Sequence, residues 1–290
     1  MINANKKIYI LSLSICLFII ISCCFSSIAQ YQPSKSSSQE LLDIIMKKES
    51  KYANYYAETV PGNFDSNGST GYFFVFTDIK KDNSLGKYVD IWYGSGSKVS
   101  KIADELDVYK FESVKLCGKT YFRYDLAYVT DSQTILLSVS KGKCIESFRA
   151  PGQAKFENSN SFTVYCSAYD MITDKEYGYT TGHTWKNYYF YADSKGIHEY
   201  TAEQINIKDF NKYSNGTTIM KHLKKNFLKK DTKVSYKFLK RNNNLIHINI
   251  DAETKESVNY YYTYKIDKTN KLEMIDSGEG RYANAVTKLK

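Results

Sequence analysis

Short segments rich in Tyr, Phe, Val and Ile recur along most of this chain, and Gly, Asn, Asp or Ser separate them. Aromatic and β-branched residues favour strands, and the residues between them favour tight turns. The pattern is typical of a meander of hairpins. We therefore expect strands over residues 72–76, 88–93, 108–116, 120–129, 134–140, 143–148, 161–171, 185–191, 196–200, 234–239, 245–250, 258–266 and 271–275.

Helices are expected in three places. Residues 38–55 carry an apolar stripe at helical spacing, Thr201 to Gln204 have the spacing of a capping box, and residues 217–229 place apolar side chains opposite lysines. The expected fold class is mainly β (α+β). It comprises an antiparallel meander, propeller-like or sandwich-like β region, followed by a smaller α+β region.

The amino terminus has the parts of an export signal. Lys6 and Lys7 precede an apolar run over residues 8–21 that is short for a membrane span. Two cleavage positions remain open. Cleavage after Ala29 would free a soluble protein, whereas the run from Ile20 to Cys23 resembles the lipobox of bacterial lipoproteins, with Cys23 as the lipidated residue. We expect an extracytoplasmic protein that is either lipid-anchored to the cell membrane or secreted.

These signals divide the chain into four parts. Residues 1–29 form a signal peptide, or residues 1–22 in a lipoprotein, and residues 30–39 form a polar tether. A helix and β region is expected over residues 40–200, and an α+β region over residues 201–290. The abundance of Lys, Asn, Ile and Tyr indicates an AT-rich genome and a Gram-positive source.

The net charge favours some partners over others. The formal charge is +9, and removal of Lys6 and Lys7 with the signal leaves +7. Such a field would attract a cell-wall polyanion or phospholipid headgroups. The dense basic patch from Lys221 to Lys230 is interpreted first as a solvated helix face, and second as a polyanion site. No nucleic-acid-binding signature accompanies the charge, and no nucleic acid partner is expected.

Three cysteines, Cys117, Cys144 and Cys166, follow the signal segment. An odd number outside the cell permits at most one internal bridge. Alternation along the strand segment places Cys166 on the same face as Phe162 and Val164, which indicates a buried thiol. We expect no obligatory disulfide, and the spacing of the cysteines fits no zinc site.

One loop carries a family resemblance. Residues 62–68, with the sequence Gly-Asn-Phe-Asp-Ser-Asn-Gly, run into the strand segment 72–76 and resemble the Asp-rich loop of FG-GAP or VCBS-type repeats. In those β-propeller repeats, loop carboxylates and amides hold calcium. The resemblance implies Asn63, Asp65 and Asn67 as ligands. With a single carboxylate among them, we expect a degenerate loop that keeps its conformation without Ca²⁺, and we expect no other cofactor.

A second resemblance covers more of the chain. Residues 90–93, 118–122 and 182–191 are similar to uncharacterised secreted or lipid-anchored proteins of clostridial bacteria. This resemblance implies a location and an architecture, and it brings no activity.

No catalytic motif is apparent. The four histidines match no zinc helix, and no Gly-x-Ser-x-Gly elbow is present. Two Ser-x-x-Lys patterns, at Ser95 and Ser138, lie in turn or strand segments, where the lysine would not face the serine. We therefore predict no catalytic residues.

Aromatic residues cluster in two strand segments, residues 188–191 and 260–264. Exposed rings can stack on sugars, although half-buried tyrosine is also common in sheets, and packing is the preferred interpretation. The candidate aromatic binding surface consists of Trp185, Tyr188, Tyr189 and Tyr191. The sequence thus predicts an exported cell-surface binding or interaction module without catalytic activity. The alternative is an undetected carbohydrate-active or other extracellular hydrolase.

Overall fold

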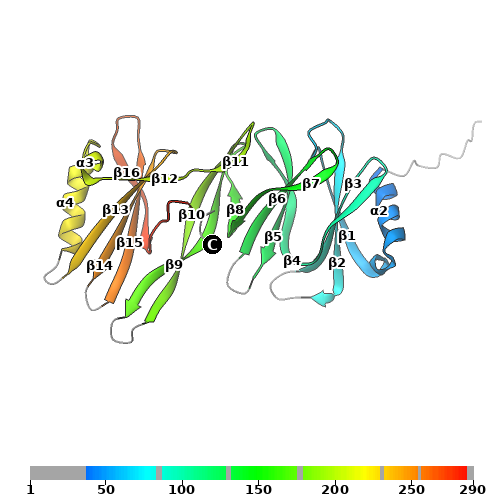
Figure 1. The fold of residues 1–290 in the computed structure, drawn as a ribbon, viewed down its shortest axis with the longest axis horizontal. Coiled ribbons are helices and arrows are strands. Elements are labelled where there is room, and N and C mark those ends of the chain that lie inside the picture. The colour runs from blue at the N-terminus through cyan, green and yellow to red at the C-terminus, as the bar shows by residue number, and fades with distance from the viewer. Residues whose placement is uncertain are drawn as a thin grey trace, which may run out of the picture. The chain divides into compact units, whose positions relative to one another are not determined.

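A computed structural model describes residues 37–82, 87–128, 132–174, 179–228, 232–253 and 256–285 (Figure 1). It confirms the mainly β fold class, with antiparallel sheets and few helices. Residues 1–36 lie outside the described residues, and with them Cys23, both cleavage positions and most of the tether. Within the described part of the chain, no helix is long and apolar enough to cross a membrane.

The first sheet is a seven-stranded meander in which each strand pairs with the next along the chain. Helix α2 and the short 3-10 helix η1 precede it. The bounds are α2 Ser37–Lys48, η1 Ser50–Asn54, β1 Tyr55–Gly62, β2 Gly71–Asp82, β3 Lys87–Ser95, β4 Lys98–Leu116, β5 Lys119–Ala127, β6 Ser132–Ser140 and β7 Lys143–Pro151.

This first sheet curls around its own apolar face. β1 lies against β4 and β5 as well as against β2, so the face is enclosed. Alternate residues of β2, β3, β5 and β6 fill it, with Phe73, Ile91, Phe122 and Ile135 completely or almost completely buried. The opposite face of β2 and β3 carries Phe74, Phe76 and Trp92, which α2 covers with Leu41 and Ile45.

The second sheet is nine-stranded and begins immediately after Gly152. Its main order is β11-β10-β9-β15-β14-β13-β12, with β8 paired to β9 and β16 paired to β15. The bounds are β8 Gln153–Phe156, β9 Ser161–Asp174, β10 Tyr179–Asp193, β11 Gly196–Glu199, β12 Ala202–Ile205, β13 Lys233–Arg241, β14 Leu245–Glu253, β15 Glu256–Ile266 and β16 Leu272–Glu279.

Two helices cover one face of the second sheet. α3 (Ile207–Phe210) and α4 (Gly216–Phe227) place Phe210, Met220 and Leu223 against the alternating isoleucines of β14, which are Ile246, Ile248 and Ile250 (Figure 1). The other face of β13–β15 joins a core that both sheets share. We call this the central core; it consists of buried residues from β4–β10, β13, β15 and the segment after β16.

Two helix predictions need correction. The segment 38–55 is helical only to Lys48, because η1 follows and turns Tyr52 into the core beneath α2, and β1 then begins at Tyr55. The capping box at Thr201 to Gln204 does not begin a helix. Ala202 to Ile205 instead pair with β13, and the cap shifts to Asn206, whose side chain accepts a hydrogen bond from the backbone N–H of Asp209 at 3.0 Å.

Candidate functional site

The Asp-rich loop is held by hydrogen bonds within the protein. The Asp65 carboxylate accepts from the backbone N–H of Lys141 at 3.0 Å and from the side-chain amide of Asn67 at 3.1 Å. The Asn67 side chain in turn accepts from the backbone N–H of Ser69 at 2.8 Å. Gly68 adopts a left-handed conformation with φ of 85°. The hydrogen bond from Lys141 ties the loop to the β6–β7 hairpin, and the Asn67 contacts stabilise the turn within the loop.

Two of the predicted calcium ligands, Asp65 and Asn67, therefore contact each other and the backbone. Both oxygens of Asp65 already accept protein donors. In the described part of the chain, no three His, Cys, Asp or Glu side chains converge as a metal site would require. Asp65 and Asn67 thus stabilise the turn, and calcium binding by Asn63, Asp65 and Asn67 stays a prediction to be tested.

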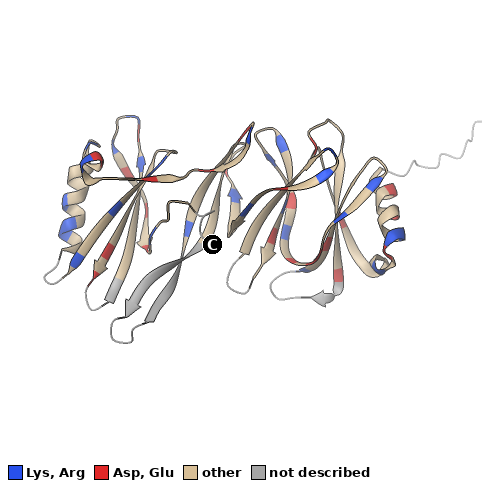
Figure 2. Ribbon diagram, viewed as in Figure 1, with Lys and Arg blue, Asp and Glu red and all other residues tan. Residues whose placement is uncertain are grey.

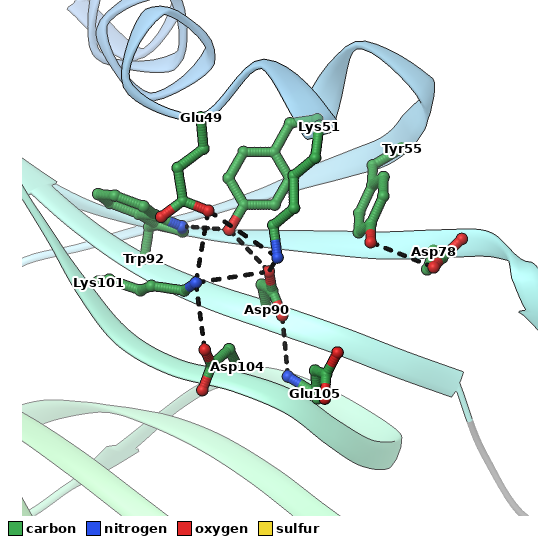
Figure 3. A network of polar contacts seen from close by, with 10 residues as sticks. Glu49, Lys51, Tyr55, Asp78, Asp90, Trp92, Lys101, Asp104 and Glu105 are labelled. Atoms are coloured by element: carbon green, nitrogen blue, oxygen red, sulfur yellow. Dashed lines mark hydrogen bonds and ion pairs between the residues drawn. The ribbon is translucent and has the colours of Figure 1, made fainter.

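A polar network lies beneath α2, with Asp90 at its centre (Figure 3). Asp90 is 3% exposed and accepts from the Tyr52 hydroxyl at 2.7 Å and from the backbone N–H of Glu105 at 2.8 Å. The Lys51 ammonium lies 2.6 Å from the same carboxylate. Trp92 completes the network by donating its indole N–H to the Tyr52 hydroxyl at 2.9 Å.

The groups around Asp90 favour its ionised form. Burial alone would raise the pKa of Asp90, but the hydrogen bonds from Lys51, Glu105 and Tyr52 outweigh burial, and the pKa lies below its usual value. Burial also raises the pKa of the Tyr52 hydroxyl. Glu105 itself has a positive φ of 52°, at an irregularity in the β3–β4 pairing that its hydrogen bond to Asp90 stabilises. The network thus joins η1, β3 and β4.

A second buried ion pair lies on the outer face of the first sheet. Arg123 donates to both carboxylate oxygens of Asp125, at 3.0 and 2.6 Å, and these two side chains are 3% and 0% exposed. The same guanidinium donates to Glu112 at 2.9 Å and to the backbone carbonyl of Ala154 at 2.7 Å. Because Ala154 belongs to β8, this ion pair links the two sheets.

A third network holds the segment after β16, residues 280–285, which we call the C-terminal strap. Arg241 is completely buried and donates to the backbone carbonyls of Ala283 and Asn284, at 2.9 and 3.2 Å. Its Nε donates to Nε2 of His247 at 2.7 Å, and Nδ1 of His247 lies 2.9 Å from the Thr263 hydroxyl. Burial, and then the Arg241 charge, lower the pKa of His247 well below its ordinary value.

These networks hold Asp90, Arg123, Asp125 and Arg241, which are among the buried charged groups of the described residues. Asp90, Arg123 and Arg241 each contact several partners from different elements. The sequence pattern singled out none of them. The available signal was the presence of a charged residue inside an apolar strand segment, as with Asp90 between Val89 and Ile91.

The structure separates the members of the predicted aromatic surface. Tyr188 is completely buried in the central core, and its hydroxyl accepts from the backbone N–H of Ala283 at 3.1 Å, so it takes no part in an exposed surface. Tyr189 is half-buried and stacks on His247, and Tyr191 packs against His198 and Tyr200. Trp185 is half-buried at the other end of the group.

The ring that accompanies Trp185 is Tyr165, which lies outside the aromatic surface predicted from the sequence. Tyr165 is 46% exposed, and its ring lies nearly parallel to that of Trp185, with centroids 5.4 Å apart and planes at 27°. The two residues occupy diagonal positions on β9 and β10. Exposed Gln153 of β8 and Asn187 of β10 lie directly opposite Tyr165. The alternation that placed Cys166 in the core also places Tyr165 on the outer face.

The described lysines of the basic patch lie on an exposed face of α4, which both interpretations of the patch require. Lys221, Lys224 and Lys225 are exposed on α4, while Met220 and Leu223 are buried (Figure 2). The helix contains no acidic residue. The positions of Lys229 and Lys230 lie outside the described residues.

Among the described residues, the cysteines Cys117, Cys144 and Cys166 form no disulfide. Cys166 is completely buried in the central core, which confirms its predicted inward orientation. Burial raises the pKa of the Cys144 thiol to about 12, and a thiol of this kind is a poor nucleophile at neutral pH.

Comparison with protein families, with curated proteins and with solved structures gives no match for this chain.

Proposed function

We propose that this protein is an exported cell-surface binding module without catalytic activity. The observation that carries the proposal is the stacked pair of Tyr165 and Trp185 on the outer face of β9 and β10. Aromatic rings that remain on the surface of a sheet are typical recognition side chains, because they offer a large contact area at a low cost in side-chain entropy. The amides of Gln153 and Asn187 beside them supply hydrogen bonds.

The use of the buried charges supports binding over catalysis. Asp90, Arg123 with Asp125, and Arg241 with His247 each connect separate elements of the fold. A catalytic acid or base needs access to a substrate. Groups that are at most 3% exposed, and whose hydrogen bonds are directed at the protein itself, are suited to holding the fold together.

The proposed location derives from the sequence of the first 30 residues. The basic start, the apolar run and the two candidate cleavage positions belong to export signals. Lipidation at Cys23 would hold the protein at the outer face of the membrane, and cleavage after Ala29 would release it. The exposed lysines of α4 would favour an anionic cell wall or membrane surface in either case.

A sedimentation assay tests the binding function. The protein from residue 30 onward is incubated with insoluble Gram-positive cell walls, with and without their teichoic acid, and the bound fraction is measured. We expect binding, and we expect the double substitution Tyr165→Ala with Trp185→Ala to reduce the affinity by about tenfold or more, the scale of losing an aromatic anchor at an interface.

The matched control is Tyr56→Ala with Tyr128→Ala, since these tyrosines are 56% and 48% exposed and lie outside β9 and β10. Equal loss in both double variants would exclude a specific role for the aromatic pair. Release of reducing sugars from the wall by the wild-type protein would instead favour the hydrolase alternative.

A further inference from the structure

Two amide side chains border the stacked aromatic pair on β9 and β10. Gln153 of β8 and Asn187 of β10 lie directly opposite Tyr165, so the three residues form a row across three strands on one face of the sheet. Two strand spacings separate the ends of this row, a span of about 10 Å. Trp185 lies diagonally from Tyr165. We call Gln153, Tyr165, Trp185 and Asn187 the β9–β10 patch.

The polar groups of the β9–β10 patch are not used by the fold. Gln153 and Asn187 are exposed, and Tyr165 is 46% exposed. Within the described part of the chain, these two amides, the Tyr165 hydroxyl and the Trp185 indole N–H take part in no hydrogen bond. A ligand can therefore reach them without breaking a contact that holds the protein together.

The two rings are held in place before a ligand binds. They stack on each other with centroids 5.4 Å apart and planes at 27°. Their strands are anchored from the opposite face, because Cys166 and Tyr188, which follow Tyr165 and Asn187 along the chain, are completely buried in the central core. Side chains that are already ordered lose little conformational entropy on binding.

The chemistry of the β9–β10 patch matches an uncharged sugar chain. None of its four side chains carries a charge. One face of a pyranose ring presents C–H groups, which pack on the electron-rich face of an aromatic ring. The rim of the sugar presents hydroxyls that both donate and accept hydrogen bonds, as amide side chains do. The row from Gln153 to Asn187 is comparable in length with a disaccharide.

We propose that the β9–β10 patch binds a chain of neutral pyranose sugars. Tyr165 and Trp185 form the stacking platform, and Gln153 and Asn187 bind the hydroxyls. This inference rests on the proposed function and deepens it, because it names the chemical class of the ligand.

An anionic wall polymer is the alternative that the test has to exclude. Exposed Lys155 lies two residues from Gln153 on β8 and could attract such a polymer. Attraction between exposed charges is screened by salt, whereas stacking and hydrogen bonds between neutral groups are not. The salt dependence of binding therefore separates the two classes of ligand.

Titration of the protein from residue 30 onward, by calorimetry and by tryptophan fluorescence, tests the proposal. The probes are chitotetraose, whose sugars carry acetamido groups, cellotetraose, whose sugars carry only hydroxyls, and poly(glycerol phosphate). Trp92 is 4% exposed beneath α2, so a shift in emission on binding at the β9–β10 patch reports on Trp185. We expect at least one tetrasaccharide to bind saturably at millimolar concentration or below, to shift the emission and to bind equally well in high salt. The tighter tetrasaccharide identifies the kind of sugar.

Two variants test the roles of the side chains. Tyr165→Ala should weaken tetrasaccharide binding by about tenfold or more, the scale of losing an aromatic anchor. Asn187→Ala should weaken it by about three- to tenfold, as the loss of a neutral hydrogen bond predicts. The control Tyr128→Ala removes a ring that is 48% exposed and lies outside β9 and β10, and it should bind normally.

Three results would each overturn the proposal: no saturable binding of either tetrasaccharide, binding of poly(glycerol phosphate) alone, or full affinity in Tyr165→Ala. The cell-wall assay distinguishes this failure from failure of the proposed function. Sedimentation with walls that depends on Tyr165 and Trp185, without tetrasaccharide binding, would leave a binding module whose ligand is not a neutral sugar chain. Absence of binding in both assays would reject both proposals.

Discussion

Single buried polar residues hold strands of this protein in position through their hydrogen bonds. Asp90 lies between two apolar residues of β3, yet its side chain is almost completely buried and accepts hydrogen bonds from η1 and β4. A buried carboxylate is tolerated only when donors replace its water. At this site Lys51, Tyr52 and the backbone of Glu105 are those donors (Figure 3).

Asp90→Asn should destabilise the protein by about 1–3 kcal/mol, because it removes the charge that three donors share. Chemical denaturation at neutral pH measures the free energy of unfolding. The control is Asp104→Asn, which removes a carboxylate that is 64% exposed and lies 3.3 Å from the Lys101 ammonium, which is itself 3.8 Å from Asp90. An exposed ion pair of this kind contributes little, so the control should lie within about 0.5 kcal/mol of the wild type. If both variants lose the same free energy of unfolding, the burial and hydrogen bonds of Asp90 add nothing to stability.

His247 should make the stability of the folded protein depend on pH. Burial, then the Arg241 charge, depress its folded pKa, so the unfolded state binds the proton more readily. The stability from neutral His247 is therefore present above the unfolded pKa of about 6.5 and is lost as the pH falls below it, by up to about 1.4 kcal/mol per pH unit.

The variant His247→Gln isolates this effect. It keeps an acceptor for Arg241 but cannot be protonated, so the difference in unfolding free energy between wild type and variant should shrink as the pH falls from 7.5 towards 5. The control is His222→Gln on the exposed face of α4, where the ring is in water before and after unfolding. A difference that stays constant with pH in His247→Gln would contradict the argument.

Asp65 tests whether the resemblance to calcium-binding repeats extends to metal binding. Because its two oxygens already accept from Lys141 and Asn67, EDTA should leave the melting temperature unchanged. Asp65→Ala should destabilise the fold by about 1 kcal/mol through the lost turn bonds. Saturable calcium binding at micromolar concentration, abolished by Asp65→Ala, would instead make this loop a metal site.

At the scale of elements, a single glycine forms the chain connection between the two sheets. Gly152 lies between β7 and β8 with a φ of 95°, and an added Cβ would meet the Tyr165 carbonyl oxygen and the Cα of Cys166. Its own carbonyl accepts from the Thr134 hydroxyl at 3.1 Å, and the same hydroxyl accepts from the Ala154 N–H at 2.9 Å. The chain therefore turns from one sheet to the next in a fixed conformation.

Gly152→Ala should be clearly more destabilising than Gly96→Ala. Both glycines have positive φ, so each alanine costs about 1–2 kcal/mol in backbone strain, but the Cβ at Gly96 would meet open space. At Gly152 the backbone of β9 must also move, which adds an overpacking cost of about 1–3 kcal/mol. Thermal and chemical denaturation of the two variants measure the difference. Similar losses would show that the β7–β8 connection adapts easily.

The elements that sequence could predict were those with a strong local pattern. Most strands and α4 lie close to their expected positions, because alternation and helical spacing are properties of the segments themselves. The sequence pattern did not predict the first half of β4, because this part of the strand is rich in charged residues. Its irregular pairing with β3 is stabilised by the hydrogen bond to Asp90, which no local pattern reveals. The capping-box spacing at Thr201 wrongly predicted a helix, because residues 202–205 pair with β13 as a strand. The Tyr165–Trp185 pair was only partly predicted, since it requires the register of β9 against β10.

At the scale of the whole molecule, the central core couples the unfolding of the two sheets. It contains Leu136 and Phe148 of the first sheet, Phe190 of the second sheet and Tyr282 of the C-terminal strap. Arg123 adds a buried contact from the first sheet to β8. Because each sheet completes the other's core, opening either one would expose apolar surface of both. We therefore expect a single cooperative transition for the part of the chain that contains the two sheets.

The two tryptophans of the sequence allow this to be measured, because each one reports on a different sheet. Trp92 is buried beneath α2 on the first sheet, and Trp185 lies on β10 of the second. Trp185→Phe leaves Trp92 as the reporter, and Trp92→Phe leaves Trp185. In each variant, the fluorescence transition in denaturant should coincide with the far-ultraviolet circular dichroism transition, even where the substitution lowers the midpoint. Separate transitions would mean that the sheets unfold independently and that the central core contributes less than the internal packing of each sheet.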